Sequence, residues 1–235
     1  MRQRDRGFPF FVLSAFLAIF VGTAHAEQTS VASEPARRLL KVRTIGILDP
    51  TVDVFELSAG GIREKKDEWC AQGRSNITGE IVRELSKKGY TVKVIERTGD
   101  LRNSLEEISD LYQAIVYSYR VHSLRGPNYF ASKGERFDYS VGALDQILDV
   151  YGVDSLVLAF GIEESSTGGR KALMAVGALT GVIFRAGGTL LNVSLADRDG
   201  TIYWNEERSG GSLTDQDSVK NTIAQMFDEL PKATP

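Results

Sequence analysis

The stretch from residue 190 to 204, LLNVSLADRDGTIYW, decides the fold of this 235-residue chain. Residues 190–195 and 201–204 are rich in apolar and β-branched side chains, and Asp199-Gly200 lies between them. An Asp-Gly pair between two such runs is a strong hairpin signal because glycine accepts the positive φ that the tight turn requires. The stretch therefore predicts an antiparallel pair of strands near the end of the chain.

Three further strands are predicted upstream of this hairpin. Residues 42–48 form a β-branched run, and residues 90–95 alternate between apolar and polar side chains. Residues 155–160 are apolar throughout, as expected of a central strand that is covered on both faces. Residues 51–63 are ambiguous, although the spacing of their valines is compatible with an extended stretch.

Segments with helical periodicity separate and follow these strands. One helix ends near Lys88, and a second opens at Ser104, with a glutamate three residues later as in a capping box. A third covers residues 141–151, and the last runs from near Thr214 to Pro231. The order β-α-β-α-α-β-β-β-α, with a C-terminal hairpin and a closing helix, predicts an α/β sandwich on a mixed sheet.

The first 26 residues have the pattern of an export signal. Three arginines precede an apolar run over residues 8–21, and Ala24-His25-Ala26 forms a small-x-small cleavage site. The run is shorter than a bilayer span of about 20 residues, which favours a cleaved signal over an uncleaved anchor. No cysteine follows the run, so a lipid-modified signal is not expected. We therefore expect a periplasmic protein, with outer-membrane association left open.

The mature chain is expected to hold one domain. Residues 27–38 are polar and lack an apolar period, which predicts a flexible tether, and residues 39–235 suit a single α/β domain. The full chain has a net charge of −3, and removal of the arginine-rich signal makes the remainder more negative. A mildly acidic protein without basic clusters is a poor candidate for binding nucleic acid or anionic lipid by charge alone.

Side chains suited to catalysis are scarce in the expected mature protein. His122 is its only histidine, so a metal site built on imidazoles is not expected, and no G-x-S-x-G motif supports a triad with Ser123. A hydrolase that uses His122 is nevertheless kept as an alternative hypothesis. Cys70 is the only cysteine, which excludes an intrachain disulfide. A buried thiol is the favoured interpretation, and pairing with another chain is the alternative.

Three polar clusters are candidates for binding sites. The pair Glu163-Glu164, with Ser165-Ser166, follows the predicted central strand, and a solvated turn is favoured over a ligand site there. Residues 167–171 lack the spacing of a phosphate-binding loop. Turn chemistry accounts for Asp197 and Asp199 without a metal ion. We therefore predict no catalytic, cofactor-binding or metal-binding residues and no cofactor.

The apolar, glycine-containing segment ALMAVGALTGVIF over residues 172–184 is the one feature that folding alone does not require. It is too short to span a membrane as a helix, and a core helix or strand pair is one interpretation. The other is an exposed surface that docks on a partner or membrane. On that hypothesis the contact residues are Ala172, Leu173, Met174, Val176, Leu179, Val182, Ile183 and Phe184.

The pattern of strand, Asp, turn Gly, strand and Trp over residues 190–204 resembles that of a group of bacterial envelope proteins. The turns at Lys88-Gly89-Tyr90 and at residues 151–154, each before a strand, match the same group. Its members include relatives of the curli-secretion protein, activators of penicillin-binding proteins, the N-terminal domain of the Tol-system propeller protein and ABC-transport auxiliary lipoproteins. The resemblance implies a non-enzymatic accessory domain that binds envelope proteins, without shared catalytic residues.

The sequence therefore leads to three hypotheses of function. The first is an exported adaptor of the cell envelope that makes contact through residues 172–184 or through an exposed sheet edge, with an unidentified envelope protein as partner. The second is a membrane-inserting oligomer of the curli-secretion-pore type, which the resemblance implies. The third is the hydrolase. Homo-oligomerisation remains open, and nucleic acid is not an expected partner.

Overall fold

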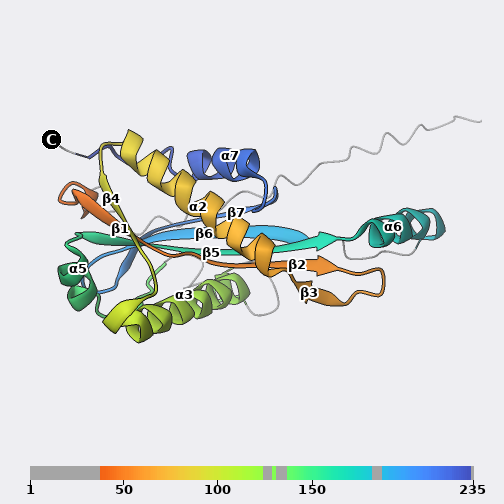
Figure 1. The fold of residues 1–235 in the computed structure, drawn as a ribbon, viewed down its shortest axis with the longest axis horizontal. Coiled ribbons are helices and arrows are strands. Elements are labelled where there is room, and N and C mark those ends of the chain that lie inside the picture. Colours follow the sequence, from red (N-terminus) through yellow and green to blue (C-terminus); the bar gives the residue numbers. More distant parts are fainter. Residues whose placement is uncertain (1–37, 124–128, 131–136, 182–186, 234–235) are drawn as a thin grey trace, which may run out of the picture.

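The computed structural model describes residues 38–123, 129–130, 137–181 and 187–233. The predicted signal and all of the predicted tether except Arg38 lie outside the described residues. The described chain has a mixed α/β fold, as the sequence predicts, built on a seven-stranded sheet (Figure 1). The strands are β1 (Thr44–Leu48), β2 (Thr51–Leu57), β3 (Arg63–Lys65), β4 (Thr91–Ile95), β5 (Ser155–Ser166), β6 (Gly188–Ala196) and β7 (Ile202–Ser209).

Strand β5 is the axis of the sheet. Along one edge it pairs in parallel first with β1 and then, in its second half, with β2. Along the other edge it pairs with β6, which is antiparallel to it and continues to β7. Strand β4 lies parallel to β1, and the short strand β3 lies antiparallel to β2. Around the first half of β5 the strand order is therefore β4-β1-β5-β6-β7. Around the second half of β5, the far end of the sheet, the order is β3-β2-β5-β6-β7.

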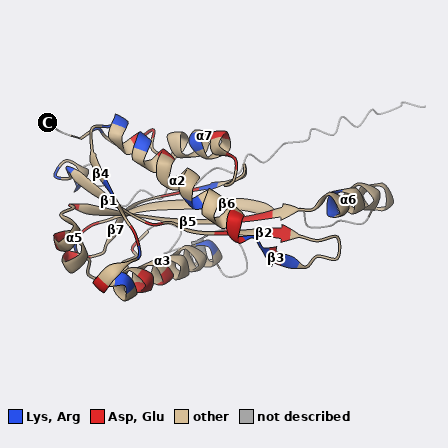
Figure 2. Cartoon of the chain, in the orientation of Figure 1, with Lys and Arg blue, Asp and Glu red and all other residues tan. Residues whose placement is uncertain are grey.

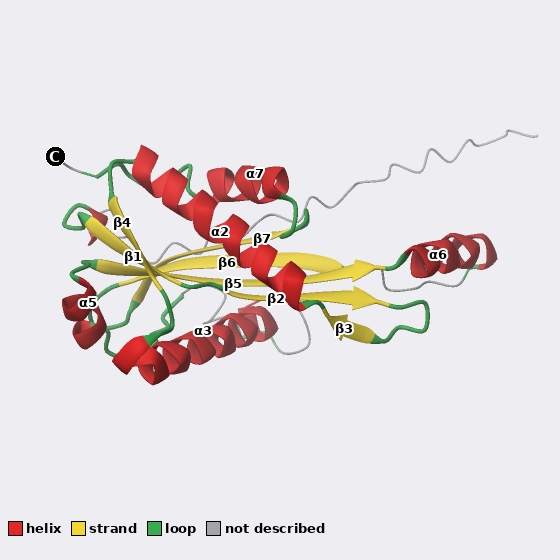
Figure 3. Cartoon of the chain, in the orientation of Figure 1, coloured by secondary structure: helices red, strands yellow, loops and turns green. Residues whose placement is uncertain are grey.

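Helices cover both faces of this sheet (Figure 3). Helices α2 (Asp67–Lys87) and α7 (Gln216–Met226) pack on one face, and α3 (Arg102–Ser123) and α5 (Asp145–Tyr151) pack on the other. Because side chains alternate along a strand, β5 supplies both cores. Val157 lies in the core beneath α2 and α7, whereas Leu156 and Phe160 lie in the core beneath α3 and α5.

The hairpin that decides the fold is present. Strands β6 and β7 pair across the turn at residues 197–201, and Gly200 has a φ of 80°. A Cβ atom at Gly200 would meet the carbonyl oxygen of Gly142, so the turn needs glycine for its φ and for space. Trp204 on β7 is buried, and its ring contacts that of Phe227 after α7 (5.3 Å between centroids). The closing helix is thereby held to the hairpin.

Several boundaries differ from the sequence predictions. Helix α5 begins at Asp145 and not at residue 141, and α7 ends at Met226, before the predicted end at Pro231. The second helix begins at Arg102 and follows a 3-10 turn over Gly99–Leu101, so the capping box predicted at Ser104 is wrong. Gly99 has a φ of 72°, which starts the turn earlier than the periodicity indicates. The central strand does not stop at residue 160. It continues to Ser166 because β2 and β6 extend the hydrogen-bonded ladder on both of its edges.

The ambiguous segment 51–63 is now resolved. It contains β2 and begins β3, with a tight loop between them that is closed by a hydrogen bond from the Gly61 amide to the Ser58 carbonyl (2.9 Å). Thr51–Leu57 alternates between buried and partly exposed side chains, as a half-covered strand does. This β2–β3 loop lies at the far end of the sheet, next to the apolar segment (Figure 1).

Candidate contact site

The apolar segment forms a helix at the far end of the molecule. Helix α6 (Gly168–Thr180) connects β5 to β6, and Figure 1 shows it beyond the end of the sheet, away from the four packed helices. The Thr167 side chain caps its start by accepting a hydrogen bond from the Arg170 amide (3.2 Å), and Gly181 ends it with a φ of 77°. Both caps are local, so the helix is defined by its own sequence.

Most apolar side chains of α6 are exposed. The exposed fractions of Leu173, Val176 and Leu179 are 38%, 58% and 88%. Along the helix, the buried residues are Arg170 and Gly177. The hypothesis that this segment is core is therefore wrong for its described part. Of the other candidate contact residues, Ala172 is exposed and Met174 is partly exposed, whereas Val182, Ile183 and Phe184 lie outside the described residues.

The start of α6 contacts the end of β2 and the β2–β3 loop. The Thr167 amide donates to the Leu57 carbonyl (3.0 Å), and Arg170 Nη1 donates to the Ser58 carbonyl (3.3 Å). Ile62 in the same loop is 71% exposed. Helix α6 and the β2–β3 loop lie far apart in the sequence but together form one end of the molecule. Both carry exposed apolar side chains. We call α6 and the β2–β3 loop (residues 58–62) together the tip.

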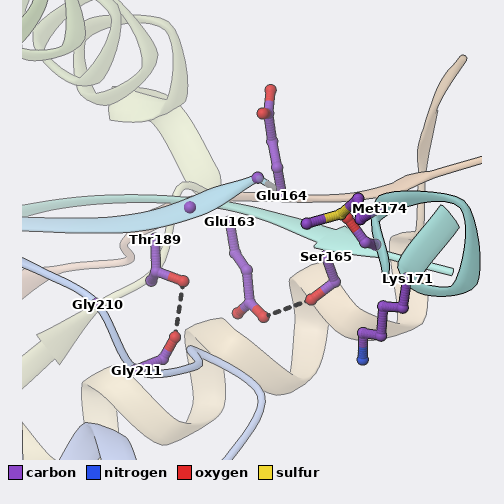
Figure 4. A pocket seen from close by; sticks show the side chains of 11 residues that line it. Glu163, Glu164, Ser165, Lys171, Met174, Thr189, Gly210 and Gly211 are labelled. Atoms are coloured by element: carbon purple, nitrogen blue, oxygen red, sulfur yellow. Dashed lines mark hydrogen bonds between the residues drawn. The ribbon is translucent and has the colours of Figure 1, made fainter. Parts of the chain in front are cut away.

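A shallow hollow lies beside the tip (Figure 4), where β5 meets the start of α6. The carboxylate of Glu163 is buried in its wall and accepts hydrogen bonds from Ser165 Oγ (3.0 Å), Ser212 Oγ (3.0 Å) and the Leu213 amide (2.7 Å). These bonds tie β5 to the start of the loop that leads into α7. The partners of this carboxylate in these hydrogen bonds are therefore structural.

Glu164 points to the opposite face of the sheet from Glu163, as alternation in a strand requires. Its Oε1 atom pairs with Arg63 Nε on β3 (2.9 Å), and the Arg63 guanidinium also lies over the Phe55 ring. The sequence interpretation of residues 163–166 as a solvated turn is therefore wrong. The two adjacent carboxylates are separated by the sheet and do not form a pair that could share a ligand.

The histidine and the cysteine lie on opposite sides of the sheet. His122 is near the end of α3, where its ring contacts that of Phe130 (5.0 Å between centroids). Cys70 on α2 is buried, as predicted, and its Sγ atom accepts a hydrogen bond from the Val54 amide (3.2 Å). Because α2 and α3 cover different faces, these two side chains do not form a nucleophile–base pair. The hydrolase hypothesis gains no geometric support.

The aspartates of the hairpin turn act locally. The carboxylates of Asp197 and Asp199 both accept hydrogen bonds from the Thr201 amide (3.1 and 2.8 Å), and Asp197 also pairs with Arg38. Hydrogen bonds from the Thr201 side chain and, to a smaller extent, from its amide lower the pKa of the Asp199 carboxyl below its usual value. Within the described residues, no group of three or more potential metal-binding side chains converges. Hydrogen bonds within the turn engage both carboxylates, as predicted from the sequence, and Asp197 has Arg38 as a further partner.

A buried polar row lies beneath α3, and the sequence analysis missed it. The Tyr112 hydroxyl donates to Asn192 Oδ1 and lies 2.9 Å from Ser194 Oγ, and Ser194 Oγ donates to Asn205 Oδ1 (2.7 Å). At its end, Glu207 pairs with Arg120, yet burial raises the pKa of the Glu207 carboxyl above its usual value. Alternating polar residues on β6 were the available signal, and they face the core because α3 supplies matching partners.

Comparisons with known proteins add no relative. No protein-family model matches the chain, and no curated protein sequence matches it either. Among the helices of the described residues, none is long and apolar enough to cross a membrane. With 13 residues, α6 spans about 20 Å, against about 30 Å for the hydrocarbon core of a bilayer. The site therefore has to be interpreted from its geometry.

Proposed function

We propose that the protein is a non-enzymatic accessory protein of the bacterial cell envelope and that it acts by contact through its tip. The single observation that carries the proposal is the exposure of the apolar side chains of α6. Large apolar patches that face water mark sites of protein or membrane interaction. Val176 and Leu179 contribute nothing to the two buried cores, so their apolar character calls for a role outside folding.

Charge supports the same assignment. Figure 2 shows basic residues at the start of α6 and no acidic residue along the helix. Beyond Lys171 the helix consists of small and apolar residues up to Thr180. An enzyme would need polar groups that converge on one point, whereas Glu163, Ser165 and Thr189 beside the tip are held in structural hydrogen bonds. The export signal and the resemblance to envelope proteins supply the proposed location.

The test compares two ends of the molecule. We expect the double variant Val176→Asp, Leu179→Asp to fold normally but to lose its association with the cell envelope, measured as the fraction of exported protein that sediments with envelope membranes. The matched control is Val150→Asp on α5, because Val150 is 65% exposed but lies at the opposite end (Figure 1). Equal association of all three proteins would contradict the proposal.

A second candidate is a membrane-inserting oligomer. It is favoured by the distribution of exposed residues around α6: Ala172, Leu173, Ala175, Val176, Ala178 and Leu179 cover most of the helix circumference. A protein groove takes one face of a helix, whereas lipid can take nearly all of it. Flotation of the purified protein with lipid vesicles, and a particle size that depends on detergent, would favour this candidate. A monomer that stays with the aqueous phase would favour a protein partner.

A further inference from the structure

Arg170 occupies an unusual position in the tip. It is 8% exposed, although it lies in the first turn of a helix that projects from the body. A cation near a helix N-terminus is disfavoured because that end carries a partial positive charge. Arginine is also seldom buried unless its donors are satisfied. Two unfavourable placements at one residue imply that its contacts outside the helix stabilise the position.

One of those contacts is made with the β2–β3 loop. Arg170 Nη1 donates to the Ser58 carbonyl (3.3 Å), and a Cβ atom at Gly61 would lie 3.5 Å from the same nitrogen. Gly61 has a φ of 83°, a conformation that favours glycine. Gly169 lies equally close to the loop, since a Cβ atom there would be 3.7 Å from the Cβ of Ala59.

We propose that Arg170 is a latch that fixes the direction of α6 by binding the β2–β3 loop. Helix α6 and this loop then behave as one rigid tip. Without the latch, the remaining anchors at the start of α6 include the Thr167 amide, which donates to the Leu57 carbonyl, and the covalent link to β5. Gly168 and Gly169 form the start of α6 and carry no side chains that could restrain it. Arg170 is therefore a positioning residue. Its contribution to binding a partner through the tip rests on the proposed function.

The latch can be tested without any partner. In a Cys70→Ser background, spin labels at Leu179→Cys on α6 and Gln225→Cys on α7 report the direction of α6 relative to the body. With Arg170 present we expect one narrow distance peak. In Arg170→Ala we expect a broad distribution of distances in place of that peak. In Arg170→Lys, which keeps a hydrogen-bond donor, we expect the narrow peak to be partly restored. If Arg170→Ala does not fold, Arg170→Met keeps the length of the stem and lacks the donors.

The matched control is Lys171→Ala, which removes the same charge from the same helix end but at an exposed residue. It should keep the narrow peak. An unchanged peak in Arg170→Ala and Arg170→Met, or equal broadening in Lys171→Ala, would overturn the latch. The Asp variants of Val176 and Leu179 test the proposed function separately. If envelope association survives those variants while Arg170→Ala broadens the distance, the latch stands and the proposed function fails.

Discussion

The body of this protein, which is the sheet with its four covering helices, and the tip contain the same kinds of apolar residue. They differ in whether these residues are buried. In the body, leucines and valines lie in two cores between the sheet and its four covering helices, where burial stabilises the fold. In the tip, α6 carries a run just as apolar, yet three of its large side chains face solvent. The difference shows that apolar character alone does not identify a core segment. Whether such a segment is buried depends on which other elements pack against it.

The largest expected effect comes from one substitution made in both regions. Leu195→Ala on β6 removes a fully buried side chain and should lower the free energy of unfolding by about 2–5 kcal/mol. Leu179→Ala on α6 removes a side chain that is 88% exposed and should change it by less than about 0.5 kcal/mol. Denaturant unfolding measures both. A large loss in Leu179→Ala would mean that the tip belongs to the cooperative core.

A smaller effect separates two glycines with similar backbone angles. Gly200→Ala in the hairpin turn should cost about 1–2 kcal/mol from its left-handed φ, and more because the new Cβ atom meets the Gly142 carbonyl. Gly181→Ala has a similar φ but nothing within 4 Å. It should speed amide exchange at the end of α6 and leave global unfolding unchanged. Equal losses of global stability would remove the distinction between body and tip.

The smallest effect concerns the buried polar row of the body. The pKa of Glu207 is raised by burial in the folded state, so between its ordinary value, about 4.3, and the raised one the folded protein binds more protons than the unfolded chain. The stability contributed by this group therefore falls as pH rises through that window. Glu207→Gln does not ionise, so the wild type should lose stability relative to the variant from about pH 4 upward. A difference that is independent of pH would contradict this.

Much of the body could be predicted because its signals are local. The Asp-Gly turn, the β-branched runs and the glycine that ends the helix before β4 each act within a few residues, and the strands and helices followed from them. The extension of β5 to Ser166 could not, since its polar end is stabilised by β2, β6 and the Ser212 region, which lie far away in the sequence.

Only part of the tip could be predicted from the sequence. Residues 172–184 stood out by composition, but whether they are covered depends on where α6 leaves the sheet. Arg170 was seen only as part of a failed phosphate-loop pattern. Its role requires the β2–β3 loop, which lies more than a hundred residues earlier in the chain. The spacing of residues along α6 carries no information on that contact.

The most direct test of the contact role is site-specific photo-cross-linking in the bacterial envelope. A photoreactive residue in place of Leu179 should give a discrete cross-linked product or a lipid adduct, because the side chain is exposed at the tip. The same residue in place of Val150, exposed at the opposite end, should give none. Products from Val150 and none from Leu179 would contradict the account.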